Sequence, residues 1–285
     1  YQQAQLSMGI FSTQTVSVGD LFAGAMVPGL ILVFLYVLYM LATAFLKPEV
    51  APPARQQDLD AAALESHLCL RIIKSLLPPL LLIFAVLGSI LSGAATPTEA
   101  AGVGALGSII LALINARLTF AVFRDVALAT AKVTSMVYLI LIGASIFSLV
   151  FRGFGGDIIV EDLFMDMPGG VVTATLIVML AVFLLGFILD FIEITYMVVP
   201  IVGPVLLAMG LDPIWLGVML AVNLQTSFLT PPFGFALFYL RGCAPPEVHT
   251  SQIYRGVIPF IIIQLFMLGL LALWPGLTTW LPSRL

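Results

Sequence analysis

The chain has 285 residues, of which 61% are hydrophobic and 9% charged, with a formal net charge of −4. Its long apolar runs exclude an ordinary soluble domain, and they lack the alternation of membrane barrel strands, so they predict a helical membrane protein. The sequence contains no G-K-[ST] phosphate loop, no cysteine–histidine cluster and no basic aromatic patch. Nucleotide hydrolysis, transition-metal catalysis and nucleic-acid binding therefore have no support, and two cysteines make no disulfide framework.

The chain begins with a mixed polar segment, residues 1–20, which we interpret as a loop or a re-entrant tail. Residues 21–46 form the first predicted membrane span. A hydrophilic connector follows at 48–60, and residues 61–75 have the apolar spacing of a helix that lies on the membrane surface.

Two shorter apolar runs come next, residues 76–92 and 103–116. Pro78 and Pro79 lie near the expected start of the first run, where a helix tolerates proline. Each run is short for a membrane crossing, but two crossings fit the charge distribution of the flanking segments.

Between these runs lies the motif T-P-T-E. Pro97 has no N–H to donate, so it leaves the carbonyl of Gly93 without its helical partner. We expect Thr96 or Thr98 to cap the following helix, with Glu99 close to its positive end. The motif is then either a purely structural helix start or a ligand site.

Basic and acidic residues predict the orientation in the membrane. The segments 47–74 and 117–132 hold seven of the eleven Lys and Arg residues. A further span is predicted at 133–151, followed by an acidic loop at 152–170. The positive-inside rule places both basic segments in the cytoplasm and the acidic loop outside.

Residues 171–210 contain only two charges, Asp190 and Glu193. One helix of that length would extend roughly 60 Å at about 1.5 Å per residue, twice the thickness of the bilayer core, so the segment must fold back. We expect the reversal near P-I-V-G-P at 200–204. A carboxylate at bilayer depth costs at least ~2.5–3.5 kcal/mol, so Asp190 is expected to have a partner or a cation, unless it lies at the far interface. Glu193 either shares that site or marks the interface.

A broken helix is predicted at 213–240. Pro231 and Pro232 interrupt it and release the carbonyls of Ser227 and Phe228, which lipid does not tolerate unless protein, water or an ion satisfies them. The candidate ligands around the break are Asn223, Gln225, Thr226, Ser227 and Thr230.

Thr230 is the most specific of these candidates. Most membrane Ser and Thr hydroxyls bond to the preceding helical turn, and we expect this of Thr134, Ser145 and Ser148. Thr230 is expected to fit that pattern poorly, because two helix-incompatible residues follow it.

The ends of the last elements are marked by local signals. Gly210 to Pro213 reads as a helix stop followed by an Asp N-cap and a proline at the first helical position. After a loop at 241–255, residues 256–274 form the last predicted span, and Trp274 and Trp280 suit a membrane interface.

Several motifs together resemble the large membrane subunit of tripartite ATP-independent periplasmic (TRAP) transporters, the DctM type. They are V-G-D-L-F-A-G-A-M-V-P-G at 18–29, G-A-A-T-P-T-E-A-A-G at 93–102, F-L-L-G-F-I-L-D at 183–190, P-I-V-G-P at 200–204, G-L-D-P-I-W-L-G-V at 210–218 and L-T-P-P-F-G-F at 229–235. The resemblance covers nearly the whole chain and corresponds to the C-terminal part of that subunit. We therefore expect residues 1–285 to form a single integral membrane domain, with the N-terminal repeat of the family not included.

The resemblance implies an all-α polytopic fold with inverted repeats, re-entrant hairpins and proline-broken helices, working as an elevator. It implies a transporter rather than an enzyme, with no cofactor and with Na⁺ as coupling ion. Its implied activity is uptake of organic acids delivered by a periplasmic binding protein, across the bacterial inner membrane and together with a small four-helix membrane subunit.

One implied sodium site falls on Asp190 and on the break, including Pro231 and Pro232. Thr96, Pro97, Thr98 and Glu99 carry over only as a signature of uncertain role. The open alternatives are an inactive fragment of such a permease and a passive channel. An intramembrane aspartyl protease needs two facing carboxylates, whereas Glu193 lies on the same segment as Asp190.

Overall fold

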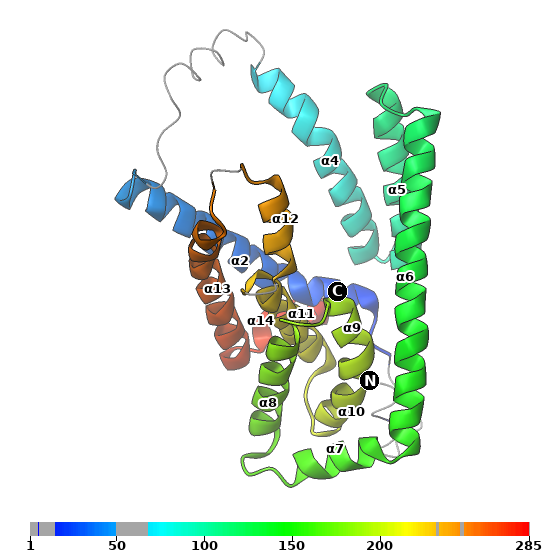
Figure 1. Cartoon of the computed structure of the whole chain (residues 1–285), viewed down its shortest axis with the longest axis vertical. Helices are drawn as coiled ribbons and strands as arrows, with labels where there is room; N and C mark the ends of the chain where they lie inside the picture. The colour runs from blue at the N-terminus through cyan, green and yellow to red at the C-terminus, as the bar shows by residue number, and fades with distance from the viewer. Residues whose placement is uncertain (1–4, 6–14, 50–67, 232–233, 246–247, 285) are drawn as a thin grey trace. The chain divides into compact units, whose positions relative to one another are not determined.

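A computed structural model describes residues 5, 15–49, 68–231, 234–245 and 248–284 (Figure 1). Within these ranges every regular element is a helix, which confirms the predicted all-helical class. The chain divides into two compact units, one of residues 1–32 with 131–285 and one of residues 33–130.

Among the described residues, five helical segments are long and apolar enough to cross a membrane, and they support a multi-pass membrane protein. They are α2 (Val18–Leu46), α5 (Pro97–Ile114), α6 (Phe120–Gly153), the continuous segment Phe191–Ala208 and α13 (Thr250–Leu273).

The smaller unit contains α4 (Leu68–Leu91) and α5, which lie side by side after a tight turn (Figure 1). The predicted boundary between a surface helix and a span near residue 75 is wrong, because α4 runs through it without a break. Pro78 and Pro79 lie inside this helix rather than near its start. Apolar helices tolerate such prolines where neighbouring groups or local adjustments satisfy the freed carbonyls. The start of the predicted surface helix lies outside the described residues.

α6 is a single helix of 34 residues, so the basic segment before residue 133 forms its first part. The acidic segment, predicted as a loop, contains the helix α7 (Gly156–Met165). Gly155 and Gly169 flank this helix with φ of 74° and 97°, and glycine adopts such left-handed conformations without steric cost.

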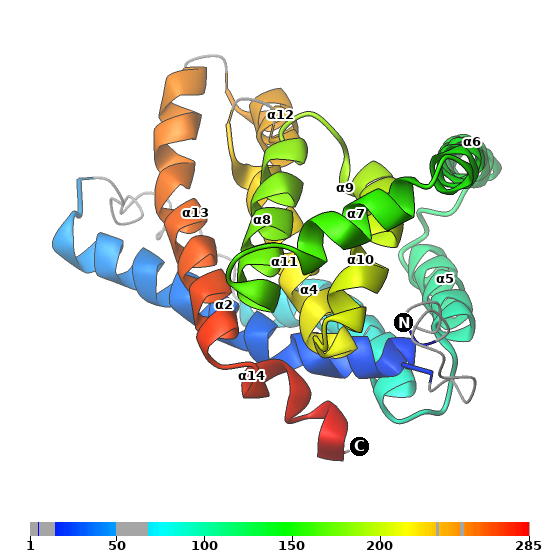
Figure 2. The ribbon, with the colours of Figure 1, turned by 90° about the horizontal axis from the view of Figure 1, so that it is seen from below.

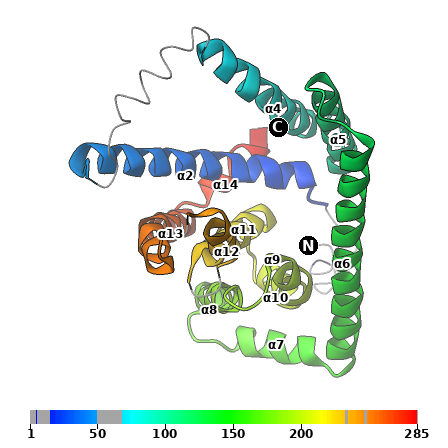
Figure 3. The ribbon, with the colours of Figure 1, turned by 45° about the horizontal axis from the view of Figure 1, so that its top comes forward.

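The larger unit is built around α11 (Pro213–Leu229). Figure 3 shows α11 and α12 (Phe235–Cys243) between α13 on one side and the helices α9 and α10 on the other. The indole N–H of Trp215, near the start of α11, donates to the carbonyl of Leu271 near the end of α13 at 2.8 Å. At the opposite end, Leu237 of α12 packs with Val257 from the first half of α13. α11 and α13 are therefore antiparallel.

The start of α11 confirms the predicted stop and start signals. Gly210 has φ of 96°, the side chain of Asp212 accepts the N–H of Trp215 at 2.8 Å, and Pro213 is the first helical residue. The first half of α2 approaches this end of α11 closely at Gly24. A Cβ on Gly24 would lie 2.9 Å from the carbonyl oxygen of Thr278 in α14 (Gly276–Thr279), so the approach requires glycine.

Candidate functional site: a hairpin tip against a helix break

A helical hairpin precedes α11. Its first arm is α8 (Gly170–Leu185), and its second arm runs through α9 (Phe191–Glu193), the π-helical turn Ile194–Val198 and α10 (Val199–Ala208). The two arms pack together, and Figure 2 shows them beside α11. The chain reverses over residues 186–190.

The predicted reversal at 200–204 is therefore wrong. Pro200 is tolerated because it lies in the first turn of α10, and Pro204 lies within that helix. Just before them the helix widens into a π turn, in which the N–H of Val199 bonds to the carbonyl of Ile194. Local widening of this kind, rather than a turn of the chain, accommodates the prolines in the second arm.

The length of the first arm matters for the position of the tip. α8 has 16 residues, which extend about 24 Å, less than the roughly 30 Å of a bilayer core. The helix α8 is thus shorter than the bilayer core, and Asp190 follows it after the turn at 186–189.

Asp190 caps the second arm. Its Oδ1 accepts the backbone N–H of Phe191 at 2.7 Å, and its side chain is partly buried. Glu193 follows in the first turn of the same arm and is also partly buried. The tip therefore carries one carboxylate at a helix N-terminus and a second one within a turn of it.

The hairpin contacts the last turns of α11 at three levels. Gly186 lies against Ser227 so closely that a Cβ on Gly186 would overlap the serine hydroxyl. The rings of Phe191 and Phe228 lie 5.7 Å apart between centroids. Further down, the side-chain amide of Asn223 donates to the carbonyl of Met179 in α8 at 2.7 Å. The hairpin tip around Asp190 thus contacts the last turn of α11 before the break.

Hydroxyl groups at the end of α11 all donate to carbonyls of their own helix. Thr226 donates to Val222, Ser227 to Leu224 and Thr230 to Thr226, each at 2.8 Å. The expectation that Thr230 would not bond to the preceding turn is wrong. Because these protons point inward, the oxygen lone pairs remain available to accept a hydrogen bond or to coordinate a cation.

The backbone at the break explains this arrangement. The N–H of Thr230 bonds to the carbonyl of Ser227 at 3.0 Å and tightens the last turn of the helix. The prediction that the carbonyl of Ser227 is free is therefore wrong. The carbonyl of Thr226, which loses its helical partner in this way, is taken by the Thr230 hydroxyl instead. Pro231 is partly buried, and Pro232 lies outside the described residues.

The predicted ligands lie on two faces of α11. Asn223, Thr226 and Ser227 are buried, whereas Gln225 is exposed. Gln225 lines a cavity of about 580 Å³ beside the second hairpin arm, together with Phe191 and Phe228. The structure therefore does not bring all predicted ligands to one point.

The sequence analysis did not predict the role of two glycines at this site. Gly186 admits Ser227, as described above. Gly234 follows the break, and a Cβ there would lie 2.7 Å from the carbonyl oxygen of Phe228. Their signal was present, because both occur within the motifs F-L-L-G-F-I-L-D and L-T-P-P-F-G-F, but only the contacts show what the missing side chain permits.

The T-P-T-E motif belongs to the smaller unit and forms the start of α5. Thr96 is the N-cap and Pro97 the first helical residue, whereas Thr98 does not cap. Glu99 accepts both the backbone N–H and the hydroxyl of Thr96 at 2.8 Å, and its own N–H donates to the Thr96 oxygen at 3.4 Å. These reciprocal hydrogen bonds between Thr96 and Glu99 form a capping box, which explains the motif as a structural helix start.

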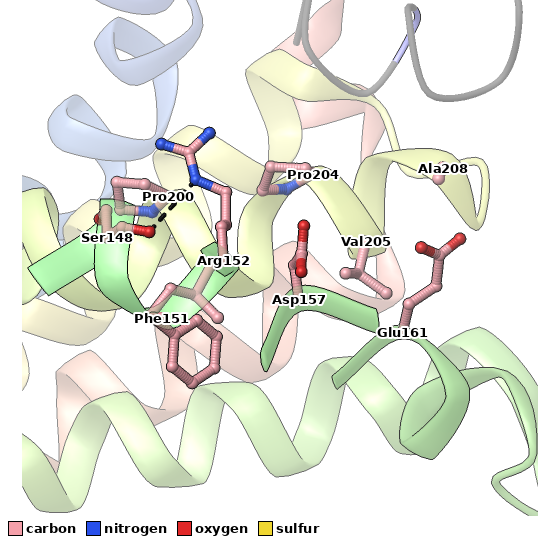
Figure 4. Close-up of a pocket in the computed structure, with 10 residues that line it drawn as sticks. Ser148, Phe151, Arg152, Asp157, Glu161, Pro200, Pro204, Val205 and Ala208 are labelled. Atoms are coloured by element: carbon pink, nitrogen blue, oxygen red, sulfur yellow. Dashed lines mark hydrogen bonds between the residues drawn. The ribbon is translucent and has the colours of Figure 1, made fainter. Parts of the chain in front are cut away.

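A second pocket, of about 110 Å³, lies at the base of the hairpin (Figure 4). Arg152, Asp157 and Glu161 line it opposite Pro204, and Nε of Arg152 donates to the carbonyl of Ser148 at 3.3 Å. Because α10 leads away from the tip, this charged pocket is separate from the candidate site.

The sequence of residues 5–277 matches the family described as Tripartite ATP-independent periplasmic transporter, DctM component. The chain is 29% identical, over 94% of its length, to the sialic acid TRAP transporter large permease protein SiaM of Vibrio cholerae, of which it covers 60%. It is 28% identical, over 98% of its length, to the C4-dicarboxylate TRAP transporter large permease protein DctM of the same organism, of which it covers 64%.

A third relative is the 2,3-diketo-L-gulonate TRAP transporter large permease protein YiaN of Escherichia coli, 28% identical over 67% of the chain and 45% of that protein. The chain spans about three fifths of the length of SiaM and DctM. The family match covers nearly all of the chain, which therefore belongs to the DctM component family of tripartite ATP-independent periplasmic transporters.

Proposed function

We propose that the chain is part of the large membrane subunit of a sodium-coupled secondary transporter for organic acids. Its relatives are named for sialic acid, C4-dicarboxylates and 2,3-diketo-L-gulonate, which are all organic acids. The proposed partners are a periplasmic protein that delivers the substrate and a small four-helix membrane subunit. The proposed location is the bacterial inner membrane.

The contact between the hairpin tip and the end of α11 carries this proposal. Gly186 and Phe191 lie at the tip and touch Ser227 and Phe228 one turn before the break. Discontinuous helices at such contacts bind coupling ions and substrates in secondary transporters, because their ends carry partial charges and unpaired backbone groups.

The helix ends at the break suit a cation and an anion at the same time. The C-terminal end of α11 is negative and offers hydroxyl oxygens whose protons are donated inward, so it favours Na⁺, with Asp190 as an anionic neighbour. The N-terminal end of α12 is positive and favours a carboxylate, whereas Asp190 already caps the N-terminal end of α9.

In the proposed cycle, Na⁺ binds near Ser227 and Thr230 and holds the hairpin tip against the end of α11. This completes the anion site, and the hairpin-bearing domain then moves across the membrane as an elevator. Each sodium ion that enters down a potential of 100 mV supplies about 2.3 kcal/mol, and its concentration gradient adds to this.

Transport by the complete assembly in proteoliposomes tests the proposal with the variants Asp190→Asn and Thr230→Val. Asp190→Asn removes the charge and keeps the size, and Thr230→Val removes only the hydroxyl. We expect both to require more sodium for half-maximal uptake, with Ser145→Ala as a control for the loss of a helix-bonded hydroxyl.

Unchanged sodium dependence in both variants would contradict the proposed ion site. Uptake that is unsaturable and independent of both sodium and the delivering protein would instead indicate a passive channel.

A further inference from the structure

Gln264 lies in the middle of α13 and is fully buried, with 0% of its surface exposed. Among the described residues, neither its Nε2 nor its Oε1 has a hydrogen-bond partner. Buried polar side chains are nearly always paired, and a buried amide without protein partners indicates a bound water or ion. The surrounding helix is apolar, which makes an unpaired amide there more costly still.

The position of Gln264 follows from the register of α11 and α13. The bond between Trp215 and Leu271 fixes one level of this antiparallel pair. Asn223 lies eight residues further along α11, about 12 Å away, and Gln264 lies seven residues back along α13, about 10.5 Å away. The two amides are therefore at nearly the same level. Since Asn223 also bonds to Met179, this level is a polar layer that extends over α8, α11 and α13.

The hydrogen-bonding chemistry of Nε2 and Oε1 of Gln264 indicates which kind of ligand can satisfy both atoms. Full burial excludes a side chain that would approach from outside the unit. A cation would satisfy Oε1 and leave the donor Nε2 unpaired, and an anion would do the reverse. Water supplies both a donor and an acceptor and is small enough for a closed helix interface. We propose that Gln264 binds internal water in the layer of α8, α11 and α13.

The structure also offers a route by which water reaches this layer. A groove of about 450 Å³ between the three helices is lined by Met179, Met219 and Leu268. Met219 lies one turn before Asn223 and Leu268 one turn after Gln264, so the groove ends about one helical turn from the amides. Its other end lies at the Gly210–Asp212 turn, where helices end. The water layer shares Asn223 and Met179 with the contact between the first hairpin arm and α11, but Gln264 itself lies on α13, outside the hairpin.

Two measurements on the intact transporter assembly test the water site. In a high-resolution experimental map, we expect ordered density about 2.7–3.2 Å from both Nε2 and Oε1 of Gln264. An empty surrounding, or a protein group bonded to either atom, would overturn the proposal.

The second measurement is hydroxyl-radical footprinting, which oxidises side chains next to bound water. Met267 is 0% exposed and lies three residues from Gln264, whereas Met165, at the end of α7 and outside the candidate membrane spans, is 61% exposed. We expect Met267 to be oxidised despite its burial, and we expect this labelling to be lost in Gln264→Leu. Gln264→Ile serves as a second variant if the leucine protein does not fold. Labelling of Met267 that persists in the folded variant, with labelling of Met165 unchanged, would also overturn the proposal.

Discussion

Two Thr-Pro pairs in this chain have the same covalent structure and opposite positions in their helices. Thr96-Pro97 starts α5, and Thr230-Pro231 ends α11. At a helix start a proline removes an N–H that would have no partner, and the side chains of Glu99 and Thr96 accept the N–H groups of Thr96 and Glu99. At a helix end the proline instead prevents continuation, and the hydroxyl of Thr230 takes over a carbonyl that has lost its amide partner.

This contrast shows that the dipeptide alone does not indicate a binding site. The first pair closes its hydrogen bonds within one turn of its own helix. The second pair lies beside contacts from another element, because Gly186 and Phe191 of the hairpin reach Ser227 and Phe228. Substitutions in both regions test the contrast, with expected effects that decrease from Gly186→Ala to Ser145→Ala.

Gly186→Ala should have the largest effect, because it breaks the contact that distinguishes the second pair. Gly186 has helical dihedrals that alanine adopts freely, so the overlap of the new Cβ with the hydroxyl and the Cβ of Ser227 causes the effect. Overpacking of this kind costs about 1–3 kcal/mol, and this cost falls on the state in which the hairpin tip packs against α11. If transport passes through that state, we expect the initial rate of uptake to fall roughly fivefold or more. The matched control is Gly203→Ala in the second arm, where the new Cβ meets Val199 at an ordinary 3.6 Å. Equal rates in the two variants would contradict the importance of this contact.

Asn223→Ala should destabilise the second region with a smaller effect. It removes the hydrogen bond from the amide to the carbonyl of Met179, which costs about 0.5–1.5 kcal/mol in the free energy of unfolding. Thermal unfolding of the purified assembly measures this loss. Gln225→Ala, on the exposed side of the same helix, should shift the midpoint little, and a shift as large as that of Asn223→Ala would refute the anchoring role.

Thr96→Val tests the first Thr-Pro pair, which we expect to be purely structural. Loss of the cap should lower the free energy of unfolding by about 0.5–2 kcal/mol, and Thr96→Ser should restore it. We expect the sodium concentration for half-maximal uptake to stay at its original value. A changed sodium requirement in Thr96→Val would show that the motif also acts as a ligand site.

Ser145→Ala should have the smallest effect. The Ser145 hydroxyl donates to Leu141 at 2.8 Å, the same type of bond that Thr230 makes, but no hairpin contact is found beside it among the described residues. We expect both the unfolding midpoint and the sodium dependence to remain within error, because exposed substitutions change stability by less than about 0.5 kcal/mol. A clear transport defect would mean that the back-bonded hydroxyl itself, rather than its surroundings, matters.

Local signals predicted the ends of helices well. The sequence from Gly210 to Pro213 behaves as predicted. So does the helix start at 96–99, where Thr96 is the cap of the two candidates. The prolines were harder to interpret. Pro78, Pro79 and Pro204 lie inside helices, because an apolar helix adjusts its bonding around a proline whenever packing holds both sides in place.

The amino-acid sequence alone specified the helical membrane class, the family motifs, the helix break at Pro231 and the capping of α5 and α11, because each depends on residues within one or two turns. Packing between helices determined where the hairpin reverses and which polar residues of α11 are buried. It also determined that Gly186 must lack a side chain and that Gln264 is fully buried. These features depend on contacts between residues that lie 40 or more positions apart, such as Gly186 with Ser227 and Met179 with Asn223. No local pattern encodes them, since the energy of such a contact exists only once the helices have packed.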